Sequence, residues 1–199
     1  MTRRFLRLAL TSLLSAASFP ALATEPLQLL APPPPPPVLM SPLACEVWEL
    51  DRQLALAVER HDEAAFAALV HAGAVFGSGM HFAGTSGREN ILRDWQGMLA
   101  GKTSRLRWRP AVAAIGGDGR TAIVHGFTWQ EDTRPETEAR WKWNSAEYTS
   151  VWTRDDDGEW RVLFRNDDLK FAAPPEDRDR RLIEKRLDLL PASCPQGTP

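Results

Sequence analysis

The order of hydrophobic periods along the chain constrains its fold more than any single motif. Three segments between residues 46 and 100 carry apolar residues at helical spacing, with a short apolar run at 74–76 between the second and the third. After Gly101 the period changes to two, and tryptophan-rich strands alternate with turns as far as Asp168. This order predicts an α+β fold, in which a curved antiparallel (mixed) sheet wraps around three N-terminal helices to form a cone.

The predicted helices have recognisable apolar stripes and ends. The first covers residues 46–60 and carries the stripe Val47, Leu50, Leu54 and Val58. The second follows Asp62, a residue type that caps helix N-termini, and ends near Gly73. The third ends before Gly101 and carries the stripe Ile91, Leu92, Trp95, Met98 and Leu99. A charged C-terminal helix over 176–190 is expected either to pack on the cone or to offer a surface to a partner.

The N-terminal segment has the features of an export signal. Residues 1–23 contain Arg3, Arg4 and Arg7, an apolar stretch and the sequence Ala21-Leu22-Ala23, which has the form of a signal peptidase site. The alternative is an uncleaved membrane anchor, although the apolar centre is short for a membrane span. We therefore expect a signal peptide (1–23), a proline-rich linker (24–44), a cone domain (45–172) and a C-terminal helix and tail (173–199). The expected location is the bacterial periplasm or the extracellular medium, with no stable membrane insertion.

Charge argues against a nucleic-acid partner. Removal of residues 1–23 takes away three arginines and no acidic residue, which changes the formal net charge from -2 to -5. Phosphate backbones require clustered Lys and Arg, and the one basic cluster of the folded region, Arg105, Arg107 and Arg109, alternates along a strand among abundant acidic residues. We expect that trio to be a solvated face of the sheet.

The two cysteines flank the predicted domain. Cys45 precedes the first helix and Cys194 follows the last. An even number of cysteines in an exported chain favours a disulfide, which here would fix the C-terminal tail to the first helix. Two free thiols and an intermolecular bridge are the alternatives.

The segments in this order resemble the SnoaL-like domain of the nuclear transport factor 2-like superfamily, and are most similar to its uncharacterised exported bacterial branch. The resemblance spans residues 46–168 and rests on the order of three short motifs: His-Asp-Glu-Ala-Ala-Phe (61–66), Tyr-Thr-Ser-Val-Trp (148–152) and Trp-Arg-Val-Leu-Phe (160–164). It implies an α+β cone, often a homodimer through the sheet, used by isomerases, cyclases, dehydratases, epoxide hydrolases and non-catalytic binders. The steroid isomerase branch has its general base where this chain has Gly77, and many relatives have an aspartate where it has Arg165.

The candidate site residues follow from the expected strand parity. Aromatic side chains facing one concave space would bind a small apolar molecule that a few polar groups orient. The predicted ligand-binding residues are Phe76, Trp95, Phe127, Trp129, Tyr148, Trp152 and Phe164, which could equally be core. The candidate catalytic bases are the imidazole of His125 and the carboxylate of Asp167 at the end of the last strand.

The sequence predicts neither a metal site nor a cofactor. His61, His71 and His81 are ten residues apart rather than three or four, and residues 77–87 lack the lysine of a phosphate-binding loop. Three hypotheses therefore remain open. The chain is a small-molecule binder, or an enzyme of the same fold that transfers protons through His125 or Asp167, or an envelope interaction module whose cone is closed.

Overall fold

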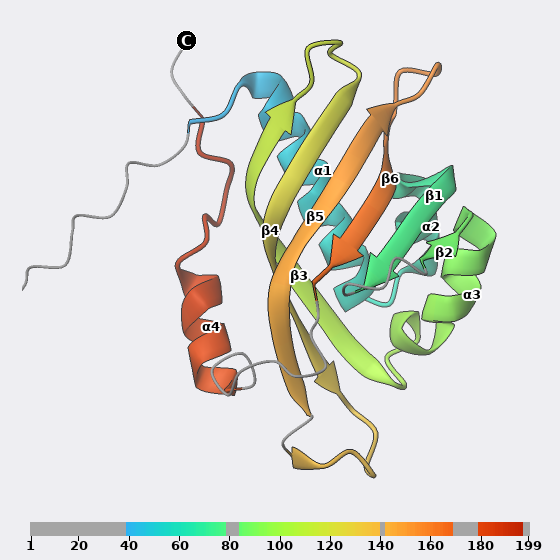
Figure 1. Ribbon diagram of the computed structural model, residues 1–199, viewed down its shortest axis with the longest axis vertical. Helices are drawn as coiled ribbons and strands as arrows, with labels where there is room; N and C mark the ends of the chain where they lie inside the picture. Colours follow the sequence, from blue (N-terminus) through green and yellow to red (C-terminus); the bar gives the residue numbers. More distant parts are fainter. Residues whose placement is uncertain (1–38, 79–83, 140–141, 169–178, 197–199) are drawn as a thin grey trace, which may run out of the picture. The chain divides into compact units, whose positions relative to one another are not determined.

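A curved, open sheet with helices on its inner side forms the body of the protein (Figure 1). The computed structural model describes residues 39–78, 84–139, 142–168 and 179–196. The predicted signal peptide, most of the linker, His81 and the segment at 169–178 lie outside these ranges. The elements in chain order are α1 (Pro42–Glu59), α2 (Glu63–Leu69), β1 (Val70–Ser78), β2 (Thr85–Ser86), α3 (Arg88–Leu99), β3 (Ser104–Ile115), β4 (Thr121–Asp132), β5 (Trp143–Arg154), β6 (Trp160–Asp167) and α4 (Arg180–Asp188).

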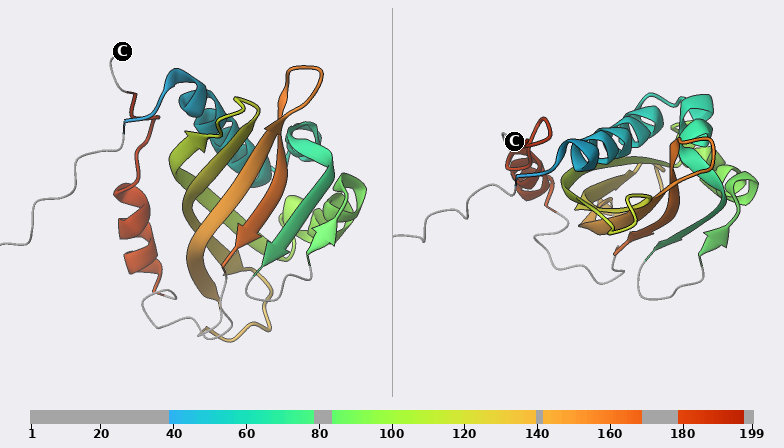
Figure 2. Two further views of the ribbon diagram at one scale, coloured as in Figure 1. Left: turned by 45° about the horizontal axis from the view of Figure 1, so that its top comes forward. Right: turned by 90° about the horizontal axis from the view of Figure 1, so that it is seen from above.

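The sheet is mixed and confirms the predicted fold class. Its strand order is β2-β1-β6-β5-β4-β3, with β1 and β6 parallel and the other neighbours antiparallel. The view from above in Figure 2 shows the sheet curving beneath α1. The first and last strands of the fold thus pair in the middle of the sheet, and β2 and β3 form its edges.

The helices start where the sequence provides caps. Ser41 accepts a hydrogen bond from the Ala44 amide (3.2 Å) at the start of α1, and Pro42 needs no partner in the first turn. Asp62 caps α2 by accepting from the Ala65 amide (2.9 Å). Helix α2 ends at Leu69, earlier than predicted, because the β-branched Val70 already begins β1.

A bulge in β6 decides which residues face the helices. Val151 pairs with Phe164 and Trp152 pairs with Val162, so Leu163 is an extra residue on β6. On either side of it, Val162 and Arg165 are both completely buried. Without the bulge, strict alternation would place these two side chains on opposite faces.

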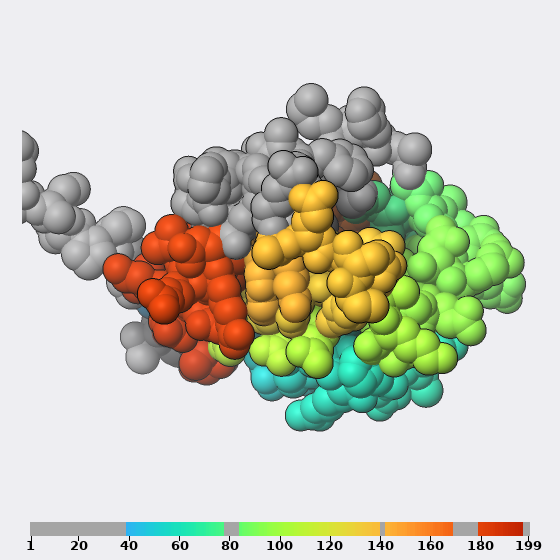
Figure 3. Space-filling model, turned by 90° about the horizontal axis from the view of Figure 1, so that it is seen from below, coloured from blue at the N-terminus to red at the C-terminus, as the bar shows by residue number. Residues whose placement is uncertain are grey.

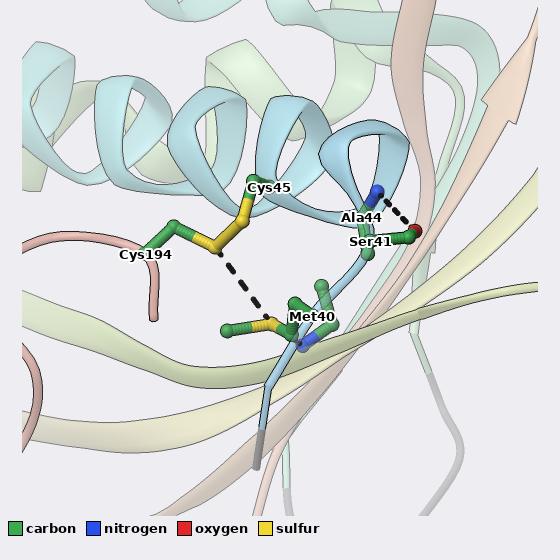
Figure 4. The surroundings of a disulfide bond; sticks show 6 residues. Met40, Ser41, Ala44, Cys45 and Cys194 are labelled. Carbon is green, nitrogen blue, oxygen red and sulfur yellow. Dashed lines mark hydrogen bonds between the residues drawn. A yellow bond between two sulfur atoms is a disulfide. The ribbon is translucent and has the colours of Figure 1, made fainter. Parts of the chain in front are cut away.

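The predicted disulfide joins Cys45 to Cys194 and is confirmed, with a Cα–Cα distance of 5.5 Å (Figure 4). A second contact holds the same tail: the Met40 amide donates to the Pro195 carbonyl oxygen (2.9 Å), and Met40 pairs with Gln196 in an isolated parallel bridge. The segment after α4 is therefore fixed beside the N-terminus of α1. Within the described ranges, no helix is long and apolar enough to span a membrane.

Candidate functional site

A buried carboxylate lies at the centre of the space between α1 and the sheet. Asp51 of α1 is completely buried and accepts four hydrogen bonds from β3 and β5. Its Oδ2 accepts from Tyr148 Oη (2.6 Å) and Trp108 Nε1 (3.0 Å). Its Oδ1 accepts from Ser150 Oγ (2.7 Å) and Trp152 Nε1 (3.2 Å). A carboxylate offers about four acceptor positions, so Asp51 has none left to take a proton from a ligand.

A buried guanidinium lies next to this cluster. Arg165 of β6 is completely buried, and its Cζ lies 3.9 Å from the ring centroid of Trp108 and 4.2 Å from that of Tyr148. The side chain forms a bidentate pair with Asp167, through Nε (2.9 Å) and Nη2 (2.6 Å). Its third nitrogen, Nη1, is buried and has no hydrogen-bond partner among the described residues. A buried charged donor without an acceptor is costly, so this atom is the least satisfied part of the cluster.

The environment sets the charge states of the two residues at the centre of the cluster. Burial raises the pKa of Tyr148 well above its usual value, and the neighbouring Asp51 carboxylate raises it further. Tyr148 is therefore a neutral hydrogen-bond donor at neutral pH. Burial alone would lower the pKa of Arg165, but the charge and hydrogen bonds of Asp167 outweigh it and raise that pKa. The cluster thus contains a fixed cation between two acidic side chains.

The two predicted catalytic residues lie on opposite faces of the sheet. Asp167 is on the inner face, where it pairs across the strands with Tyr148. Gly126 also pairs with Tyr148, so the adjacent His125 points outward. The His125 side chain is 43% exposed, and its Nε2 lies 3.7 Å from a Glu147 carboxylate oxygen. One site on this chain therefore cannot use both residues.

The predicted ligand-binding residues separate into three groups. Tyr148 and Trp152 lie on the inner face, as expected. Phe76 and Trp95 pack with Phe66 in a second aromatic cluster between β1, α2 and α3, with centroid distances of 5.3–6.2 Å. The remaining three lie on the outer face: Phe127, Trp129 and Phe164. The prediction that all of these aromatics share one concave face is wrong. In β4 the inner positions belong instead to small residues, and in β6 the bulge shifts the alternation.

Sequence reasoning missed the two residues that define the cluster. Asp51 could have been found from the sequence, because it lies between Val47 and Leu54 on the apolar stripe of the first helix, where a charged residue is unusual. The burial of Arg165 could not have been predicted, because it depends on the bulge in β6, and the alternation of residues in one strand does not show where a bulge lies.

Three cavities lined by described residues are small. They hold about 80, 120 and 200 Å³, and Asp51, Tyr148 and Arg165 line none of them. Among the residues with described positions, no group of three or more His, Cys, Asp or Glu side chains could hold a metal ion.

The curved mixed sheet and its helices have the fold of nuclear transport factor 2-like proteins. A 17% identical protein of that superfamily from Salmonella enterica serovar Typhimurium aligns over 66% of this chain and 92% of its own, with a TM-score of 0.51. A nuclear transport factor 2-like protein with a cystatin-like fold from Novosphingobium aromaticivorans is 20% identical over 64% and 82% of the two chains, with a TM-score of 0.49. Residues 50–163 match the SnoaL-like domain, and the chain belongs to that family. No curated protein matches this chain.

Proposed function

We propose that this protein binds a small amphipathic molecule on the inner face of the sheet, with Arg165 as its polar anchor. The observation that supports this proposal is the unpartnered Nη1 of a fully buried guanidinium. An acceptor atom of a ligand would satisfy that donor, and the Trp108 and Tyr148 rings on which the guanidinium lies would contact the apolar part.

The charges around Arg165 favour a neutral acceptor. Asp167 already forms an ion pair with the guanidinium, and Asp51 adds a second acidic group through the Tyr148 hydroxyl. A carboxylate ligand would bring a third anion into this region of low polarity, where like charges repel strongly. The ligand class we propose is therefore a neutral carbonyl compound with an apolar body.

The hydrogen bonds of the cluster fit a binding role better than a role in proton transfer. Both oxygens of Asp167 accept hydrogen bonds from Arg165, so each of them is already bound to a protein donor. All four acceptor positions of Asp51 are filled by protein donors. We propose further that the protein acts outside the cytoplasm. The signal-like N-terminus and the Cys45–Cys194 disulfide support that location.

The test compares matched ligands that differ only in the acceptor. The oxidised protein is titrated with apolar ketones and with the corresponding hydrocarbons, and binding is measured by native mass spectrometry and by tryptophan fluorescence. A hydrogen bond from a charged donor contributes about 1.5–3 kcal/mol, so each ketone should bind roughly 10- to 150-fold more tightly than its hydrocarbon.

Variants assign that preference to Arg165. Replacement of both partners, Arg165→Met with Asp167→Leu, removes the donor without leaving an unpaired carboxylate. The preference for the ketone should disappear in this variant. It should persist in the control Arg161→Met, because the Arg161 guanidinium of the wild type pairs with Asp155 and Asp157 in the β5–β6 turn. Absence of ketone binding, or equal binding of ketone and hydrocarbon by the wild-type protein, would refute the proposal.

A further inference from the structure

A cavity of about 120 Å³ is lined by residues of α1, of the edge strand β3 and of the segment that follows α4. Helix α1 packs against β3, and Figure 3 shows cyan atoms of α1 next to the yellow-green atoms of β3. Asp51, Tyr148 and Arg165 do not line this cavity, although Trp108 does. It is therefore a space distinct from the inner-face cluster.

Most of the cavity wall is apolar. An engineered apolar cavity of about 150 Å³ binds benzene, so a cavity of this size can hold a chain of about five carbon atoms. All three segments contribute apolar residues to the wall, among them Trp48, Leu56, Trp108, Pro110, Pro191 and Ala192.

The segment after α4 is fixed at both of its ends, so its side of the cavity is preformed. Before this segment, α4 buries Ile183, which is 1% exposed. After it, Cys194 is bonded to Cys45, and the Pro195 carbonyl oxygen accepts a hydrogen bond from the Met40 amide (2.9 Å). Binding of a ligand here requires no release of the tail.

Arg109 gives the cavity a cation without an ion-pair partner. The three arginines of β3 alternate along the strand and are exposed. Arg105 pairs with Glu131 (3.3 Å), and Arg107 pairs with Glu59 at the end of α1 (3.5 Å). Arg109 lines the cavity and forms no ion pair within the described ranges. The Arg107 pair shows that an arginine of this edge strand can reach the helix.

The other charged residues of the cavity wall already have partners. Arg52 forms a bidentate pair with Glu49, through Nε (2.8 Å) and Nη2 (2.6 Å), and Glu59 pairs with Arg107. The charge of Arg109 is thus left uncompensated. The wall also contains a neutral donor, because the Nε1 of Trp48 is buried and has no partner among the described residues.

We infer that this cavity is a second binding site, for a short-chain carboxylate of about five carbon atoms. The alkyl chain fills the apolar part between the two tryptophans, and the carboxylate pairs with Arg109. This requirement is the opposite of that at Arg165, where acidic neighbours favour a neutral acceptor. The inference does not depend on the function proposed for the inner-face cluster.

The test compares pentanoate with pentanamide, which has the same chain and no charge. Each compound is titrated into the oxidised full-length protein at constant ionic strength, and the tryptophan indole N–H signals are followed by NMR. The Trp48 signal should shift until it saturates. The Trp160 signal is the internal control, because its Nε1 is also buried and unpartnered but does not line the cavity. An exposed ion pair is weak, so pentanoate should bind roughly two- to fivefold more tightly than pentanamide.

Variants assign this preference to Arg109. Arg109→Gln should abolish the preference for pentanoate, and the matched control Arg105→Gln should keep it, because Arg105 lies on the same strand and lines a different cavity. Ala192→Phe, at an exposed position of the tail, should weaken the binding of both compounds at least about tenfold by filling part of the cavity.

Three results would overturn the inference. They are a Trp48 signal that does not respond to pentanoate, equal binding of pentanoate and pentanamide, and a preference for pentanoate that persists in Arg109→Gln. The first two are measured on the wild-type protein, so they need no variant to fold. None of them involves a ketone or Arg165, so they leave the proposal for the inner-face cluster unchanged.

Discussion

Replacement of Asp51 by asparagine removes the charge at the centre of the interior and changes little in shape. The carboxamide oxygen can accept from only one pair of donors, either Tyr148 and Trp108 or Ser150 and Trp152. The amide nitrogen is itself a donor and would face the other pair. If the nitrogen faces Tyr148 and Trp108, two buried donors have no acceptor. If it faces Ser150 and Trp152, only Ser150 Oγ loses its acceptor, because Trp152 Nε1 also donates to Ser150 Oγ (3.1 Å).

The expected loss of stability follows from that count. A buried donor left without an acceptor costs about 1–3 kcal/mol, so the loss of one or two acceptors in Asp51→Asn should reduce the free energy of unfolding by about 1–6 kcal/mol. For a chain of this size, that corresponds to a fall in Tm of roughly 2–20 °C. Such a loss is a large fraction of the stability of an ordinary domain.

Thermal and urea unfolding followed by circular dichroism measure this loss. The matched control is Glu49→Gln on the same helix, because Glu49 pairs with Arg52 at the surface and its loss should cost less than about 1 kcal/mol. If Asp51→Asn melted within about 2 °C of the wild type, the four hydrogen bonds would not stabilise the fold and the reasoning would be refuted.

Two further predictions concern the sheet and its loops. Gly126→Ala should destabilise the protein by about 1–3 kcal/mol or more, because a Cβ there would lie 2.2 Å from the Arg109 carbonyl oxygen; Gly117→Ala, with nothing within 4 Å, should change the melting temperature little. The Arg134 guanidinium lowers the pKa of Asp132 to about 2. Since this pKa is below the unfolded value of about 3.9, the stability it contributes is complete above pH ~4 and is lost as the pH falls towards ~2. When the free energy of unfolding is measured from pH ~4 to pH ~2, Asp132→Asn should lose less stability than the wild type. A pH profile identical to that of the wild type would contradict this role of Asp132.

The sequence predicted the features that local chemistry determines. The change of hydrophobic period after Gly101 correctly placed the boundary between α3 and the long strands. A helix and a strand each bury one face, and this gives the apolar residues a different period in each. The predicted alternation of strands and turns was also correct, and in the β3–β4 turn Asp118 accepts hydrogen bonds from the Arg120 and Thr121 amides. The disulfide followed from parity and position in the chain.

The candidate site could be predicted only in part, because it depends on register. A strand with apolar residues on both faces, such as β4, does not reveal which face is inside. The neighbours of Gly126 determine which face of β4 is the inner one, since only a residue without a side chain fits between the Arg109 carbonyl and the Tyr148 ring. Gly126 therefore faces inward and His125 outward. The bulge at Leu163 had a similar effect on Arg165, and both depend on the pairing between neighbouring strands rather than on the pattern within one strand.

Asp51 also restricts how the strands can be aligned. Its donors Tyr148, Ser150 and Trp152 occupy alternate positions of β5, and a slip of that strand by one residue would turn all three away from the helix. The carboxylate would then be buried in apolar surroundings with most of its hydrogen bonds lost, at a cost that a compact but misaligned chain could not offset. A single acidic side chain on the first helix thus discriminates between correct and shifted pairing of a strand formed almost a hundred residues later.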